Sequence, residues 1–169
     1  MASCLRRSVL IGAAVLWLCG PVRAEDADEE PDPVILGIML ADAALTLAQG
    51  LAATALQGKP LSAKFENADG DIQLSVYSAT ADGFVETILN PKTGAIVSTA
   101  PLTDADDLTQ AGALAAVLVS LAAATEKALA EHPQSRAISG IPKFRDGQPR
   151  ATVKLLRPTD FVTVTERLN

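Results

Sequence analysis

An internal repeat constrains the fold more than any other feature of this sequence. At an offset of 77 positions, and without a gap, three parts of one copy fall on the other: Asp69-Gly70 on Asp146-Gly147, Val76 on Val153, and Phe84-Val85 on Phe161-Val162. Each copy follows an alanine-rich stretch of helical character. Short alternating runs separated by Asp-Gly turns are typical of antiparallel hairpins. The repeat therefore predicts the same helix-and-meander unit twice.

Residues 1–24 have the features of an export signal. Arg6 and Arg7 precede an apolar run from Val9 to Leu18, and small residues near Ala24 suit signal peptidase. Ordinary secretion and the twin-arginine route both remain open. Cleavage would remove both cysteines, so the mature chain would contain neither disulfides nor thiolate metal sites. We expect a periplasmic protein.

Charge divides the remaining chain into two unlike halves. Residues 25–110 contain 15 acidic residues against three lysines, whereas residues 111–169 contain 5 acidic residues against 8 basic ones. Residues 25–33 form a dense acidic segment that is expected to be flexible. Most of the molecule would repel nucleic acid or an anionic lipid surface, and would attract cations or a basic protein. Nucleic-acid binding is therefore excluded.

The first unit is predicted to span residues 34–100. Apolar residues at three- and four-residue spacing predict one helix over residues 34–57, and Asp42 within it disfavours a membrane span. Strands are predicted at residues 61–66, 72–79 and 83–89, with a final short strand at residues 95–98. Val76 is predicted to face the helix.

The second unit is predicted to span residues 101–169. Thr103 and Asp106 form a capping signature, and the pattern from residue 104 to residue 131 predicts one helix or two with a bend. Strands are predicted near residues 136–143, 150–156 and 161–167. The predicted fold class is α+β, with two tandem units that each pack a helix on an antiparallel three- or four-stranded sheet. Each unit is expected to have its own core, made of two groups of residues: Leu47, Leu51, Val76 and Phe84 in the first, and Leu129, Val153 and Phe161 in the second.

The two copies resemble the PepSY family, which is known from propeptides of thermolysin-like metalloproteases and from exported bacterial proteins. The likeness lies in four segments: Leu45 to Gly58, Asn90 to Val97, Thr125 to Pro133, and the hairpin around Asp146-Gly147. The resemblance implies a helix packed on an antiparallel sheet, twice, in a non-catalytic role. Inhibition or regulation of proteases is the activity that it implies.

No recognisable catalytic constellation occurs in the sequence. The only histidine, His132, directly precedes a proline at a predicted helix end, so no base is paired with a nucleophile. Too few imidazoles and thiolates are present to favour zinc or copper. The protein is therefore predicted not to be an enzyme.

The first predicted turn is the candidate metal site. It carries four oxygen-bearing side chains, Glu66, Asn67, Asp69 and Asp71, whereas the equivalent positions of the second copy hold Lys143, Phe144, Asp146 and Gln148. Hard cations such as calcium or a lanthanide prefer oxygen ligands. Asp104, Asp106 and Asp107 form a second acidic cluster, for which helix capping is the simpler explanation.

Two functions follow from these observations. The first is binding of a hard multivalent cation, calcium or lanthanide, by the acidic turn, and a metal shared between two molecules would produce a homodimer. The alternative is a protease-inhibiting or envelope-regulating module that binds a protein partner through a sheet edge or an exposed sheet face.

Overall fold

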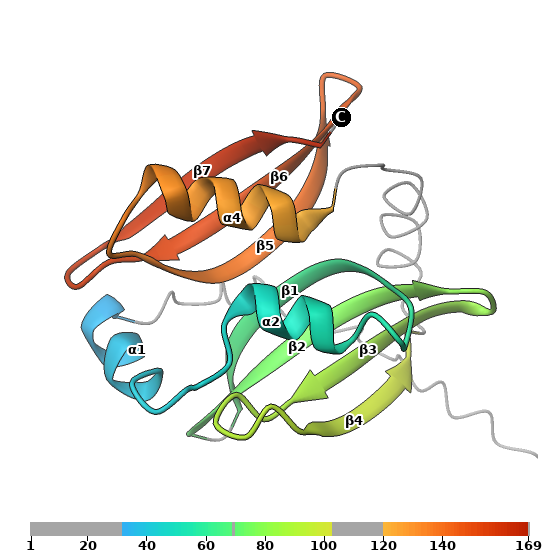
Figure 1. Ribbon diagram of the computed structural model, residues 1–169, viewed down its shortest axis with the longest axis horizontal. Coiled ribbons are helices and arrows are strands. Elements are labelled where there is room, and N and C mark those ends of the chain that lie inside the picture. Colours follow the sequence, from blue (N-terminus) through green and yellow to red (C-terminus); the bar gives the residue numbers. More distant parts are fainter. Residues whose placement is uncertain (1–31, 69, 103–119, 169) are drawn as a thin grey trace, which may run out of the picture. The chain divides into compact units, whose positions relative to one another are not determined.

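The computed structural model describes residues 32–68, 70–102 and 120–168, and these residues belong to one compact unit that begins at residue 31. Helices and strands in this part follow in the order α1 (Pro33–Met39), α2 (Leu47–Ala53), β1 (Lys59–Ala68), β2 (Asp71–Thr80), β3 (Gly83–Leu89), β4 (Ile96–Pro101), α4 (Leu121–Glu131), β5 (Arg136–Arg145), β6 (Gln148–Leu156) and β7 (Phe161–Arg167). Figure 1 shows their arrangement. The predicted signal peptide and most of the acidic segment lie outside the described residues.

The seven strands form one continuous antiparallel sheet in the order β4-β3-β2-β1-β5-β6-β7. Each predicted strand is confirmed, with ends that differ by a few residues. The predicted assembly into two tandem helix-on-sheet units is wrong. Half of the described residues are in strands and the helices among them are short, so this part of the molecule is mostly a single large sheet.

The two copies meet at β1 and β5. These strands pair through Ala63 with Gly140 and through Lys64 with Ser139. Ala63 and Gly140 are themselves separated by 77 positions, so the copies are related by an approximate twofold axis near this pair.

Edge pairing explains why the separate units of the prediction do not occur. If each meander stood alone, β1 and β5 would each be an open edge with unpaired backbone groups. Joining them satisfies part of both edges, and α2 and α4 then pack against each other as well as against the sheet. Residues of both copies consequently share one hydrophobic core.

One face of the sheet, here called the helix face, is covered by α2 and α4 (Figure 1). Contacts at two glycines bring the helices close to the strands. A Cβ atom on Gly140 would lie 3.1 Å from Leu121 of α4, and one on Gly50 of α2 would lie 2.2 Å from Leu74 of β2. The other side of the sheet is called the opposite face.

Most of the predicted core residues are buried, but Phe84 is a correction. Val76 and Val153 are fully buried on the helix face, and Leu47 and Leu51 are buried in α2. Phe84 is half-buried and is register partner to Ala79. Since Ala79 lies an odd number of positions from Val76, strand alternation places Phe84 on the opposite face.

The predicted helix over residues 34–57 is wrong, because the chain forms two short helices instead. Thr46 starts α2 with a capping box, in which its hydroxyl accepts from Gln49 N–H at 3.2 Å and Gln49 Oε1 accepts from Thr46 N–H at 2.8 Å. Between the helices, Arg136 of β5 donates hydrogen bonds to the carbonyls of Leu40, Ala43 and Leu45. A break in the helix supplies carbonyls for this arginine to bind.

A break at Ser120 interrupts the segment that is predicted to form one helix or two. Ser120 has extended backbone angles and caps α4 by accepting from Ala123 N–H, so a single unbroken helix from residue 104 to residue 131 is wrong. Residues 103–119, with Asp104, Asp106 and Asp107, lie outside the described residues. Within the described ranges, no helix has the length and apolar character needed to cross a membrane.

Candidate functional surfaces

Two hairpins, one from each copy, have the same backbone plan and opposite charge. The acidic hairpin joins β1 to β2 over residues 66–73, and the basic hairpin joins β5 to β6 over residues 143–150. In both, a two-residue turn is closed by a register pair, Ala68 with Asp71 and Arg145 with Gln148. Asp146 and Gly147 have φ of 54° and 72°, as the two central residues of a type I′ turn require.

The acidic hairpin contains the predicted metal ligands. Glu66 Oε1 lies 3.5 Å from Lys64 Nζ, and Glu66 Oε2 accepts from Ser75 Oγ at 3.1 Å. Asn67 Oδ1 accepts from Gly70 N–H at 2.9 Å, which holds the turn. Asp71 is exposed, and Asp69 lies outside the described residues.

Strand alternation divides the predicted ligands between the two faces. Asn67 is register partner to Ile72, whose side chain is buried on the helix face. Glu66 and Asp71 point to the opposite face at diagonal positions, where Cβ atoms lie roughly 7–8 Å apart. No cluster of three or more metal-ligating side chains of the His, Cys, Asp or Glu type occurs among the described residues. The predicted cation site remains a prediction.

The basic hairpin carries a row of cations that the sequence reasoning missed. Lys143 of β5, Arg150 of β6 and Arg167 of β7 are successive register partners, so their side chains stand side by side on the opposite face. Arg145 follows two residues beyond Lys143 on the same strand face. Among the described residues, none of these four side chains forms an ion pair. The signal that would have found them is the alternation of Lys143, Arg145 and Arg150 about the Asp-Gly turn.

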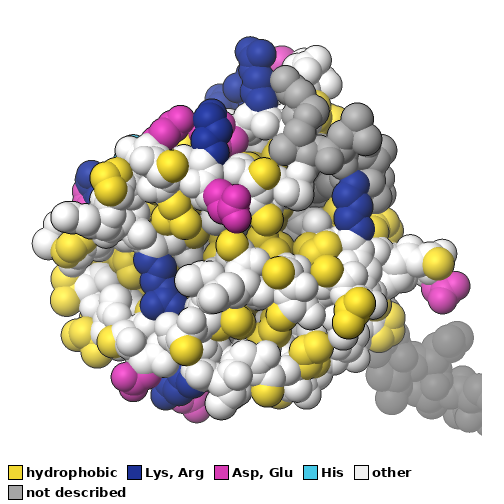
Figure 2. Space-filling model, in the orientation of Figure 1, with side chains coloured by type: hydrophobic (Ala, Val, Ile, Leu, Met, Phe, Trp, Pro, Cys, Tyr) yellow, Lys and Arg dark blue, Asp and Glu magenta, His cyan; other side chains and the backbone are white. Residues whose placement is uncertain are grey.

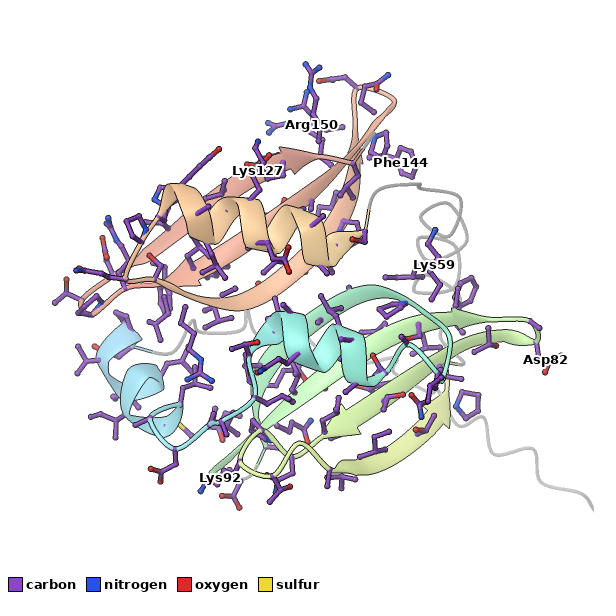
Figure 3. All side chains as sticks on the ribbon, in the orientation of Figure 1. Lys59, Asp82, Lys92, Lys127, Phe144 and Arg150 are labelled. Carbon is purple, nitrogen blue, oxygen red and sulfur yellow. The ribbon has the colours of Figure 1, made fainter. Side chains whose placement is uncertain are left out.

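Phe144 is the exposed aromatic residue of this hairpin. It is 49% exposed and is register partner to Pro149. Figure 3 shows Phe144 and Arg150 on opposite sides of the projecting hairpin, and Figure 2 shows Lys and Arg side chains at that end, among other places. The hairpin tip is therefore both cationic and partly apolar.

The sheet has two edges, and they differ in regularity. Edge strand β4 contains an irregularity near Ile96 and ends at Pro101, which has no N–H to donate. Both features weaken an edge as a template for pairing. Edge strand β7 keeps its register with β6 over seven consecutive pairs. β7 is consequently the more regular of the two edges.

Backbone hydrogen bonds show which groups of β7 face outward. Leu168 N–H donates to Pro149 O at 3.0 Å and Arg157 N–H donates to Asp160 O at 2.9 Å, and both bonds lie one position beyond the ends of the β6–β7 ladder. The end pairs of the ladder, Arg150 with Arg167 and Leu156 with Phe161, are therefore of the non-hydrogen-bonded type. Hydrogen-bonded and non-hydrogen-bonded pairs alternate in antiparallel sheets. The N–H and C=O groups of Thr163 and Thr165 therefore point away from β6. In β4, the bond from Leu102 N–H to Phe84 O places Thr99 in the equivalent orientation.

A shallow groove of about 610 Å³ lies between α1 and the start of β5. Exposed apolar residues of α1, including Val34 and Ile38, line one side, and Leu156 with Pro158 lines the other. Arg136 reaches the groove, but its guanidinium binds three backbone carbonyls and lies 5.4 Å from the Phe65 ring centre. Burial lowers the pKa of Arg136. The side chain is a structural anchor.

Among the described residues, the second copy contains three ion pairs, one of which joins Lys127 to Glu131 within α4 at 3.7 Å. Lys127 of α4 donates to Glu166 of β7, and this hydrogen bond is the main reason why the pKa of Lys127 is raised. Arg157 Nε donates to Asp160 Oδ1 at 2.7 Å, and the hydrogen bonds from Arg157 lower the pKa of Asp160. These pairs hold α4 and the β6–β7 turn in place.

No family model matches the chain, and no curated protein or solved structure is significantly similar to it. The resemblance to the PepSY family therefore stays a prediction.

Proposed function

We propose that this protein is a non-enzymatic interaction module that receives an extended segment of a partner polypeptide along β7. In this binding mode the partner adds a strand to an open sheet edge, and main-chain hydrogen bonds supply much of the affinity. A protease or another envelope protein is the kind of partner that the PepSY resemblance implies.

The observation that carries the proposal is the unbroken register of β7. Thr163 and Thr165 present outward backbone groups two residues apart, and their side chains are exposed. That spacing matches the repeat of an added antiparallel strand. The bulged edge β4, which ends in proline, offers a shorter regular stretch.

Photocrosslinking in cells tests this proposal directly. A photoreactive amino acid replaces Thr165 on β7 or Ser98 on β4, two exposed positions on the same face of opposite edges. We expect a crosslinked partner from position 165 and none from position 98. Mass spectrometry of the product then distinguishes a protease from another envelope protein.

Matched proline variants separate strand addition from other contacts. Thr163→Pro removes an outward amide of β7, and Thr99→Pro removes the equivalent amide of β4, while both leave the backbone hydrogen bonds to the neighbouring strand intact. Loss of the crosslink in Thr163→Pro alone supports the proposal. A crosslink that persists in Thr163→Pro, or that is lost equally in both folded variants, contradicts it.

Binding of a hard cation by the acidic hairpin is a second candidate. One geometric observation favours it, since Glu66 and Asp71 share the opposite face near the turn. A bound cation would have to compete with Lys64 for Glu66. Calorimetric titration of the protein with calcium and with a lanthanide tests this candidate, and absence of heat with both ions would reject it.

A further inference from the structure

We propose that the basic hairpin is a docking site for an anionic lipid membrane surface, with Phe144 entering the interface and the surrounding cations contacting lipid phosphates. The contact is peripheral, and it is independent of the strand-addition surface proposed for β7. Three features of the described residues support it.

The first feature is the row of like charges. Lys143, Arg150 and Arg167 lie directly opposite one another on neighbouring strands, and like charges in that position destabilise a sheet. The equivalent positions of the first copy, Glu66, Gln73 and Asn90, have no such row. An anionic surface would neutralise the repulsion, so the arrangement favours an anionic ligand over structural roles.

The second feature is an exposed aromatic side chain at the same hairpin tip. Phe144 lies between Lys143 and Arg145 in sequence, so strand alternation turns its ring to the helix face while the cations lie on the opposite face. The ring is 49% exposed, and Ile141, on the face of the cations, is 36% exposed. Aromatic rings are enriched at membrane interfaces, and long basic side chains reach the headgroups while their stems remain in apolar surroundings. An acidic polypeptide would form ion pairs with the cations but would leave the Phe144 ring exposed to water. A lipid surface can bind the cations through its phosphates and accommodate the ring in its apolar layer.

The third feature is the charge distribution of the chain. Its formal net charge is −6, so an anionic bilayer repels the molecule in most orientations. Within the basic hairpin, Lys143, Arg145 and Arg150 outnumber the single acid, Asp146, and Arg167 of β7 lies beside Arg150. Approach through this end brings several cations to the surface at once, which favours one orientation of the docked protein.

Vesicle flotation measures the proposed binding. The exported form of the protein is mixed with phosphatidylcholine vesicles that either contain or lack phosphatidylglycerol, at low and high salt. We expect binding only to the anionic vesicles, and weaker binding at high salt. Lys143→Gln with Arg145→Gln should reduce the partition coefficient roughly 25-fold, about fivefold for each cation. Phe144→Ser should reduce it roughly tenfold.

Lys92→Gln is the matched control for the loss of one exposed cation, because Figure 3 places Lys92 far from Phe144 in the molecule. It should bind the vesicles as the wild type does. Melting temperatures confirm that each variant is folded.

Three outcomes would overturn the proposal. They are absence of binding to anionic vesicles, equal losses in Lys92→Gln and Lys143→Gln, and binding that is unaffected by Phe144→Ser. If Phe144→Ser leaves binding unchanged and soluble polyglutamate displaces the protein from the vesicles, the basic hairpin is a site for an acidic polypeptide instead.

Discussion

The acidic and basic hairpins have the same strand register and side chains of opposite charge. Glu66 in the first corresponds to Lys143 in the second, Asn67 to Phe144, and Gln73 to Arg150. The register pair that closes each turn is equivalent in the two copies. The side chains at the two hairpin tips therefore differ, whereas the strand register is the same in both copies.

Further along the same strands, the two copies agree. Val76 and Val153 are equivalent, and both are fully buried on the helix face. Buried positions are restricted by close packing, whereas tip positions contact solvent and are free to vary. The residues that determine the fold therefore lie in the middle of the sheet, and the candidate binding residues of the two hairpins lie at its ends.

The largest expected effect concerns the shared core. Val76→Ala and Val153→Ala should each lower the free energy of unfolding by about 2 kcal/mol, since each removes fully buried methyl groups and leaves a cavity. Because both copies share one core, each variant should unfold in a single transition that involves the whole described unit. Calorimetry and circular dichroism with urea measure this.

Two separable transitions, with only one shifted by each variant, would contradict the single core. Thr163→Ser is a suitable control, because Thr163 is exposed on β7 and its replacement leaves the core unchanged.

The next effect concerns cation binding at the acidic hairpin. If this hairpin binds calcium or a lanthanide, an ion concentration ten times the dissociation constant should stabilise the protein by about 1.4 kcal/mol. Asp69→Asn with Asp71→Asn should abolish the ion-dependent rise in melting temperature while the apo protein stays folded, because asparagine also suits a turn.

Asp104→Asn with Asp107→Asn is the control, and it should spare the ion effect. If the ion effect disappears in the control and survives in the hairpin variant, the site lies at residues 104–107. If neither variant changes it, the acidic hairpin is not a cation site.

Local features of the fold were predictable from the sequence, and their assembly was not. Alternation and Asp-Gly turns predicted each strand, because hairpins depend on neighbouring residues. The pairing of Ala63 with Gly140 joins residues 77 positions apart in sequence and leaves no local signal. The capping box of Thr46 and Gln49 was present in the sequence, but the apolar spacing across it predicted one long helix.

The candidate surfaces were predicted even less completely. The acidic residues near one turn indicate Glu66 and Asp71 as candidates, whereas the row of Lys143, Arg150 and Arg167 can be identified only from the register of three strands. Arg167 lies 24 positions from Lys143, so only the folded sheet brings these charges together.

A smaller effect is a change in the free energy of unfolding that has opposite signs in the two hairpins. Lys143→Gln should raise the free energy of unfolding by about 0.5 kcal/mol, because it relieves like-charge repulsion with Arg150. Glu66→Gln at the equivalent position should lower it by a similar amount, through loss of the ion pair with Lys64. Urea denaturation at low and high salt measures both changes, and each should shrink as salt rises.

Changes of the same sign in the two variants would show that the hairpins do not differ electrostatically. Lys92→Gln, which removes an exposed cation away from both hairpins, should leave the stability nearly unchanged.

The smallest effect compares the turns at the other ends of these strands. The β2–β3 turn is held by the Thr80 hydroxyl, which donates to Gly83 O at 3.1 Å, whereas the equivalent β6–β7 turn is held by the pair of Arg157 and Asp160. Hydrogen bonds from Arg157 lower the pKa of Asp160 below its usual value of 3.8. A depressed carboxyl pKa stabilises the fold above the unfolded-state pKa, and this contribution is lost as the pH falls through the folded-state pKa. We therefore expect amide exchange to increase at the β6–β7 turn below about pH 3.8, ahead of the β2–β3 turn. Asp160→Asn should remove the difference in pH dependence, and equal acid sensitivity of both turns in the wild type would contradict the role of this ion pair.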